Sequence, residues 1–301
     1  MASTKEIKDR INSVKDTKKI TNAMYLIAST KLTKAKRELN ETRPYFEAVK
    51  TEIKRIFRTS SNIDSPYFYP VDGEPKDKGT YGILVITADK GLAGAYNQNV
   101  IKEAEKIYSS HSDYKLYVVG EYGRHYYESH HIPIEKSFLY TAYNPTMERA
   151  REITSILFNE FNNKRLSKIF VVYTDLVNAF TSKANSTRLL PFHRKEFQTF
   201  HEEKEVNIPF GFFPSEVEVL NSIMFSYISG FIYSALVDSF CSEQNARMNA
   251  MNSANDNAEK LLNNLSVQYN TLRQAEITQE INEVSAGALA LRKKHKKEAS
   301  K

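Results

Sequence analysis

Glycine and proline are distributed so unevenly in this chain that they constrain its fold more than any other feature. The 301 residues contain ten Gly and nine Pro, and sixteen of these nineteen lie between Pro66 and Pro214. Pro44 is the one such residue before that region, and only Gly230 and Gly287 follow it. Because Gly and Pro interrupt helices, the distribution predicts two long terminal helices around an inserted globular domain.

The N-terminal segment has the pattern of an amphipathic helix. Apolar residues recur every three or four positions from Ile7 to Leu39, with Lys and Arg between them. Ser3 followed by Glu6 predicts a capping box at its start. We expect Pro44 to kink or split this helix, because it removes one backbone donor and clashes with the preceding turn.

The C-terminal segment predicts a second, longer helix. Ser215 is a suitable N-cap, with Glu216 and Glu218 in a first turn where the helix dipole favours acidic side chains. A heptad-like apolar pattern runs over 251–272 and resumes over 277–291 after a phase shift. Such a pattern requires a helical partner.

The charges of the two ends suit each other. Residues 1–60 hold fifteen Lys and Arg against seven Asp and Glu, whereas residues 215–291 hold three against nine. This complementarity predicts an antiparallel coiled coil, with a basic tail at 292–301 and the overall charge of +6 divided among opposing segments.

The insertion also predicts a register for the two helices. If residue 58 lies opposite residue 214, facing residue numbers add up to about 272, so Met1 faces roughly residue 271 at 1.5 Å rise per residue. About thirty residues then extend without a partner helix. We expect another protein to cover their apolar stripe, which consists of Ile277, Ile281, Val284 and Leu291.

One segment is long and apolar enough to consider as a membrane span. Residues 219–237 contain no charged side chain. Ser and Asn residues dilute the segment and largely share one face, as in a helix that packs on a globular domain. We therefore favour a helix packed on the central domain and expect no transmembrane span.

The central region alternates predicted strands and helices. β-Branched and aromatic runs at 81–87, 115–120 and 168–174 predict strands, and the patterns at 100–108 and 147–163 predict helices. The fold class is thus α/β: a long antiparallel coiled coil of the N- and C-terminal helices with an inserted, Rossmann-like, three-layer α/β domain.

No catalytic or cofactor motif accompanies this domain. The segment GLAGAYN at 91–97 lacks both the dinucleotide and the NTP phosphate-loop spacing, so we interpret it as a tight strand-to-helix turn. The seven His residues show no zinc-binding spacing, and the single Cys241 has no identifiable base. The residues alone indicate a mechanical or interaction protein without a cofactor or metal.

Three segments resemble the gamma subunit of bacterial F-type ATP synthases. They are KEIKDRINSVKDTKKITNAMYLIASTKLTKAK at 5–36, ITADKGLAGAYNQN at 86–99, and a C-terminal block at 242–291 that begins SEQNARMNAMNS. They occur in the order and spacing of the family and together span nearly the whole chain.

The resemblance implies a central rotor stalk. Such a stalk transmits rotation of the membrane proteolipid ring to a catalytic head of alpha and beta subunits, and so couples ion translocation to ATP synthesis or hydrolysis. The chain would itself be non-catalytic, would contact the epsilon subunit and the ring, and would lie peripherally on the cytoplasmic face of the bacterial cell membrane. Its domains would be a shaft helix at 1–60, an α/β foot at 61–213, and a shaft helix with basic tail at 214–301.

The resemblance also implies partner-binding residues. By motif position they are Met24 and Arg247 near the coupling contact with beta, Gln274, Thr278 and Glu280 on the upper shaft, and Phe212 and Phe213 facing the ring. Relatives often carry a Tyr and an acidic residue at the last two positions. The basic tail is expected to be a solvated end, or else to modulate rotation at the mouth of the head.

Two alternatives come from other classes. A coiled-coil nucleic-acid-binding protein would explain the basic helix and tail, but the tail lacks the interleaved aromatics that such binding favours. A nucleotide-binding α/β enzyme would require ligand binding by the central domain. We expect no nucleic-acid partner.

Overall fold

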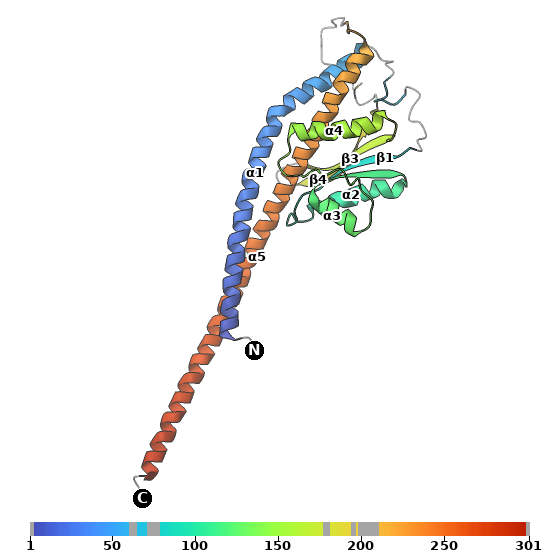
Figure 1. Ribbon diagram of the computed structural model, residues 1–301. Helices are drawn as coiled ribbons and strands as arrows, with labels where there is room; N and C mark the ends of the chain where they lie inside the picture. Colours follow the sequence, from blue (N-terminus) through green and yellow to red (C-terminus); the bar gives the residue numbers. More distant parts are fainter. Residues whose placement is uncertain are drawn as a thin grey trace. The chain divides into compact units, whose positions relative to one another are not determined.

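The computed structural model describes residues 3–59, 65–70, 79–176, 181–193, 197 and 211–298. The chain divides into two compact units. The helical unit comprises residues 1–26 with 251–301, and the α/β unit comprises residues 27–250. Figure 1 shows the two long helices and the α/β domain in the colours of the sequence.

The N-terminal helix α1 extends over Thr4–Thr59. The predicted capping box is confirmed, because the Glu6 amide donates to Ser3 Oγ at 3.2 Å and the Ser3 amide donates to Glu6 Oε2 at 2.9 Å. Pro44 lies inside the helix and does not split it. The ribbon bends in its second half, in the light-blue region (Figure 1), as expected where proline removes a backbone hydrogen bond.

The C-terminal helix α5 extends over Glu216–Glu298. Its predicted cap is also confirmed, because the Glu218 amide donates to Ser215 Oγ at 3.2 Å. Glu216 and Glu218 occupy the first turn. The side chains of the basic tail 292–301 and of Leu291 lie outside the described residues.

The central domain is built on a four-stranded sheet in the order β2-β1-β3-β4. Strands β1 (Tyr81–Ile86), β2 (Tyr114–Val119) and β3 (Lys168–Leu176) are parallel, whereas β4 (Ser182–Leu190) is antiparallel to β3. The first three confirm the predicted strands. β4 was not predicted, because it is a polar edge strand with little of the apolar alternation that identifies strands in sequence.

Helices cover both faces of this sheet, which confirms the predicted three layers. Helices α2 (Tyr96–Ser110) and α3 (Glu121–Ser129) share a core with the face that carries Val85. Helix α4 (Met147–Asn162) shares a core with the opposite face, which carries Leu84, and with the portions of α1 and α5 in the α/β unit. Helix α3 was not predicted, since it is short and contains a glycine.

The apolar segment of α5 packs on this domain. By length and composition α5 contains one stretch that could cross a bilayer, and half of that stretch is buried inside the protein. Leu220, Met224, Ile228 and Ile232 are fully buried in the core shared with the sheet. This burial supports the interpretation of residues 219–237 as a helix packed on the central domain.

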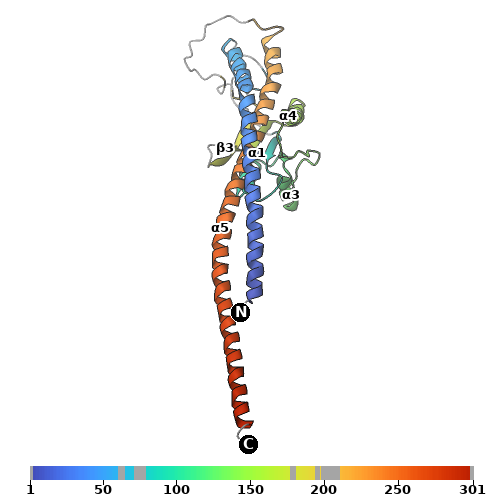
Figure 2. The ribbon, with the colours of Figure 1, turned by 90° about the vertical axis from the view of Figure 1, so that its left-hand side faces the viewer.

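In the helical unit, α1 and α5 form an antiparallel pair (Figure 2). Thr4 Oγ1 donates to Glu276 at 3.0 Å, Lys18 pairs with Glu259 at 3.4 Å, and Thr21 donates to Asn255. The predicted register was therefore wrong by one to two helical turns, because Thr21 and Thr4 meet residues four and eight positions beyond those expected. Helix α1 ends at Thr59 instead of residue 58, and α5 begins at Glu216 instead of residue 214, which accounts for some of the difference.

Candidate functional site

The turn between β1 and α2 adopts an unusual backbone conformation. Gly94 has φ 55°, and the non-glycine Leu92 has φ 62°, which places both in the left-handed region. The side chain of Leu92 points away from the core and is largely exposed. Surrounding contacts must hold this conformation, because a branched residue at positive φ is strained.

Asp89 supplies the first of these contacts. Its carboxylate accepts backbone N–H groups from Glu121 at 3.2 Å, Ala142 at 3.0 Å and Tyr143 at 2.9 Å. One side chain thus ties the β1–α2 turn to the start of α3 and to the loop before α4. Hydrogen bonds to a charged acceptor are among the stronger ones in proteins.

Arg247 of α5 supplies a second contact that holds the turn between β1 and α2. Its guanidinium donates to the carbonyl oxygens of Gly91 at 3.1 Å and Lys90 at 3.4 Å, and pairs with Glu243 one turn earlier on the same helix. The Arg247 and Glu243 side chains are only 11% and 8% exposed. The guanidinium is therefore directed into the chain.

Two serines of α5 hold the end of β3 in the same manner. The Thr174 amide donates to Ser239 Oγ at 3.2 Å, and Ser242 Oγ donates to the Thr174 carbonyl at 3.3 Å. Ser239, Glu243 and Arg247 are four residues apart and Ser242 follows Ser239 by three, so all four lie on one face of the helix. We call these four residues the polar seam.

The polar seam lies where open α/β sheets usually bind ligands. Such ligands occupy the crevice at the carboxyl ends of parallel strands, and here α5 contacts β3 near its carboxyl end and the turn that follows β1. A phosphate loop offers backbone N–H groups to its ligand, but the 90–91 turn directs two carbonyl oxygens at Arg247. The geometry therefore supports the interpretation of 91–97 as a structural turn.

Burial governs the electrostatics of the polar seam. It raises the pKa of the Glu243 carboxyl, against the opposing effect of Arg247. Burial and the nearby Glu243 carboxylate also raise the pKa of Tyr96, whose hydroxyl lies beneath the same region. Removing one partner of such a buried pair is costly, because it leaves the other charge without compensation.

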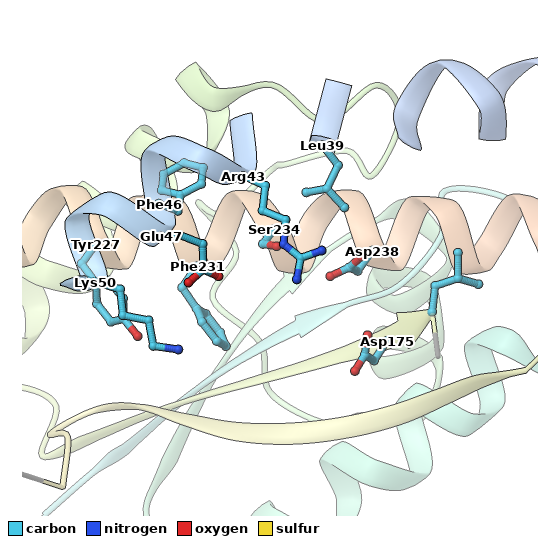
Figure 3. A pocket seen from close by; sticks show the side chains of 12 residues that line it. Leu39, Arg43, Phe46, Glu47, Lys50, Asp175, Tyr227, Phe231, Ser234 and Asp238 are labelled. Carbon is cyan, nitrogen blue, oxygen red and sulfur yellow. The ribbon is translucent and has the colours of Figure 1, made fainter. Parts of the chain in front are cut away.

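A second polar feature of the α/β unit is a cavity of about 410 Å³ lined by α1, β3 and α5 (Figure 3). Arg43, Asp175 and Asp238 contribute charged groups to it. Desolvation, followed by the nearby Asp175, raises the pKa of Asp238 from 3.8 to about 6, and Arg43 only partly offsets this. The negative charge of an ionised Asp238 is thus incompletely compensated in this cavity.

The described residues offer neither a reactive thiol nor a cluster of metal-binding side chains. Cys241 is a buried free cysteine, and desolvation raises the pKa of its thiol to about 12, so it is protonated at neutral pH. Across the residues that the structure describes, no three His, Cys, Asp or Glu side chains form a group that could hold a metal ion.

The predicted partner-binding residues of the shaft differ in their surroundings. Gln274, Thr278 and Glu280 are exposed on α5 in the helical unit, and Thr278 Oγ1 donates to the Gln274 carbonyl one turn earlier at 2.8 Å. Met24 lies on α1 in the same unit and is half-buried. Arg247 belongs to the α/β unit, and its guanidinium makes its contacts within the chain.

The two predicted foot residues also differ. Phe213 is 93% exposed immediately before α5. Phe212 is half-buried and packs against the core of the domain. Phe213 is thus free to contact a partner, whereas Phe212 mainly anchors the segment.

The contacts of Asp89 and of the polar seam were not predicted from the sequence. The carbonyl partners of Arg247 lie 156 and 157 residues away in the chain, so no local pattern indicates them. The only local signal is that polar and charged residues return at Ser239–Arg247 after the uncharged segment 219–237, and most of the nine residues there are polar, so the pattern does not single out the four of the seam.

Comparisons with known proteins agree in sequence and in fold. A family model described as ATP synthase matches residues 3–291. The ATP synthase gamma chain of Caldanaerobacter subterraneus is 40% identical over 292 residues, which cover 94% of this chain and 98% of that one. The sodium-ion-specific ATP synthase gamma chain of Acetobacterium woodii is 35% identical over 303 residues, which cover 96% of this chain and 99% of that one.

A solved structure of the Tetrahymena thermophila mitochondrial ATP synthase central stalk and c-ring contains a chain of similar fold. The TM-score is 0.57 at 23% identity, over 78% of this chain and 99% of that one. The nucleic-acid-binding alternative gains no support from these relatives. Since the family model and relatives at 35–40% identity both span almost the entire length, this chain belongs to the family of ATP synthase gamma chains.

Proposed function

We propose that this chain is the central rotor stalk of an F-type ATP synthase. It transmits rotation of the membrane proteolipid ring to a catalytic head of alpha and beta subunits, and so couples ion translocation to ATP synthesis or hydrolysis. The observation that carries this proposal is the full-length relationship to ATP synthase gamma chains, of which the Caldanaerobacter protein covers 94% of this chain at 40% identity.

The exposed end of α5 supports this role. Thr4 lies opposite Glu276, so α5 continues beyond the start of α1 as an unpaired helix (Figure 2). Ile277, Ile281 and Val284 form an apolar stripe there with exposed fractions of 44%, 59% and 74%. An exposed apolar stripe of this kind requires a protein partner, for which we propose the alpha and beta subunits of the head.

The remaining elements of the proposal follow from the family. The chain is non-catalytic and uses no cofactor, with the reaction taking place on the beta subunits. Its foot at 61–213 contacts the ring and the epsilon subunit, and residues 1–60 and 214–301 form the shaft. Such a protein is peripheral to the membrane, on the cytoplasmic face in a bacterium.

Rotation can change catalytic sites only if the shaft touches them unequally. A shaft that contacts three equivalent sites differently at each angle shifts their relative free energies as it turns. Met24, Arg247, Gln274, Thr278, Glu280, Phe212 and Phe213 remain the proposed partner-binding residues, although the contacts of Arg247 and Phe212 within the chain make them the weaker candidates.

Co-purification tests the proposal. The chain is tagged and recovered from native membranes, and we expect alpha and beta subunits, ATPase activity and ATP-driven ion uptake in the reconstituted complex. Ile281→Ser with Val284→Ser should reduce the recovered head at least threefold, whereas the matched control Asn282→Ser, also exposed on this helix, should not. Recovery of the chain without the head, or bound to nucleic acid, would refute the rotor function.

A further inference from the structure

The guanidinium of Arg247 makes its polar contacts within the chain. Its guanidinium is directed at two carbonyl oxygens of the 90–91 turn and at Glu243, with only 11% of the side chain exposed. An arginine engaged in this way is fixed in position by three hydrogen-bond acceptors. The planar fork of guanidinium donors suits such a site better than any other side chain.

We propose that Arg247 is a positioning residue that, with Glu243, locks the α/β domain onto helix α5 so that the two turn together. This inference rests on the proposed rotor function, because a rotor must pass torque from its foot to its shaft without a loose joint. The polar contacts of this joint include Ser239 and Ser242, which hold the end of β3, and Arg247, which holds the turn after β1.

The position of Arg247 explains why its loss should loosen this joint. Of the four seam residues it lies furthest along α5. Its guanidinium donates to the turn in which Leu92 and Gly94 have positive φ. Asp89 already fixes this turn to the rest of the α/β domain. Arg247 thus connects a turn that is rigid with respect to its own domain to the helix.

The chain contains a matched control. Arg124 is also an arginine with a nearly buried side chain, 9% exposed. It also pairs with a glutamate on its own helix, Glu121, and donates to a carbonyl oxygen, that of Tyr140 at 2.9 Å. All of these contacts lie within the α/β domain. Substituting Arg124 therefore removes an ion pair, here with a 62% exposed glutamate, and a carbonyl hydrogen bond without releasing the domain from α5.

Distance measurements on the full chain test the lock directly. Spin labels are attached to Lys102→Cys on α2 and Asn249→Cys on α5, both exposed positions, in a chain with Cys241→Ala. We expect Arg247→Ala to widen the interlabel distance distribution at least twofold and Arg247→Lys to widen it less, with Arg124→Ala unchanged. If Arg247→Ala does not fold, the test compares the widths of the distance distributions of Arg247→Lys and Arg124→Lys, and only Arg247→Lys should be wider than the unsubstituted chain.

Two outcomes of that measurement overturn the proposal. One is a distribution for the Arg247 variants as narrow as that of the unsubstituted chain. The other is equal widening in the Arg124 variants, which would show that the loss of any buried arginine loosens the fold.

A functional readout in the assembled complex separates positioning from simple loss of structure. We expect Arg247→Ala to lower the ion gradient reached per ATP hydrolysed at least twofold, and Arg124→Ala to leave this ratio unchanged. An equal fall of the ratio in Arg124→Ala would point to a merely structural role and would refute a role in coupling. If the chain does not assemble with a head at all, the proposed function fails, while the distance measurement on the full chain still decides whether the lock exists.

Discussion

A close approach of the two long helices in the α/β unit provides a sharp test of their packing. A Cβ atom built on Gly230 of α5 would lie 1.9 Å from Cδ1, 2.1 Å from Cε1 and 2.7 Å from Cγ of Phe46 on α1. Carbon atoms in contact normally lie about 3.5–4.0 Å apart. Replacement of Gly230 by Ala therefore requires the Phe46 ring or the helices to shift by more than about 1 Å.

Two opposing effects determine the free energy of unfolding of Gly230→Ala. Alanine in place of glycine inside a helix stabilises by about 1 kcal/mol. Overpacking costs about 1–3 kcal/mol, and the upper end of that range applies because three ring atoms, including Cγ close to the backbone, must move. We expect a net loss of about 1–2 kcal/mol.

A double-mutant cycle isolates the clash. In the Phe46→Ala background the ring is absent, so Gly230→Ala should become stabilising by up to about 1 kcal/mol, which gives a coupling free energy of about 2–3 kcal/mol. Urea unfolding of the full chain, followed by near-ultraviolet circular dichroism of the aromatic side chains, measures each variant.

Gly287→Ala on the same helix serves as the control, since nothing lies within 4 Å of its Cβ position. It should not destabilise the chain. A Gly230→Ala chain at least as stable as the original, or a coupling free energy below about 0.5 kcal/mol, would refute this packing of α5 against Phe46.

Two further predictions concern single side chains of the α/β unit. Because the folded chain raises the pKa of Asp238 from 3.8 to about 6, ionisation of this group opposes folding, and stability should fall as pH rises through that interval by up to about 3 kcal/mol. Asp238→Asn should remove this fall. The free energy of unfolding is measured by urea unfolding at pH 4 and pH 7, and an equal change between the two pH values in both chains would contradict the assignment. Thr146 accepts the Arg149 amide at 3.2 Å as N-cap of α4, so Thr146→Ala should lower the unfolding free energy by about 1 kcal/mol, with Thr146→Ser close to normal. An equal loss in both Thr146 variants would show that the hydroxyl cap is not the cause.

The sequence by itself determined the elements with strong local signals. The scarcity of Gly and Pro outside 66–214 identified both long helices, and the caps at Ser3 and Ser215 marked their starts correctly. The three parallel strands also have a strong local signal, since buried strands are continuous apolar runs. Elements with weak signals were missed: β4 is polar on an edge, and α3 is short.

Only the tertiary structure decided what the polar residues of α5 do. Arg247 is one charged residue among many in a helical sequence, and its carbonyl partners lie in a turn far away in the chain. Helix spacing predicts which residues share a face, but the partner of that face depends on how the chain closes. The register of the coiled coil was also off by one to two turns, because heptad patterns repeat and admit several alignments. Periodicity thus specified which segments are helical, but it overestimated the buried face of α1, where Ile20 and Ile27 are 62% and 54% exposed. Long-range packing decided which of these positions are covered and what each face meets.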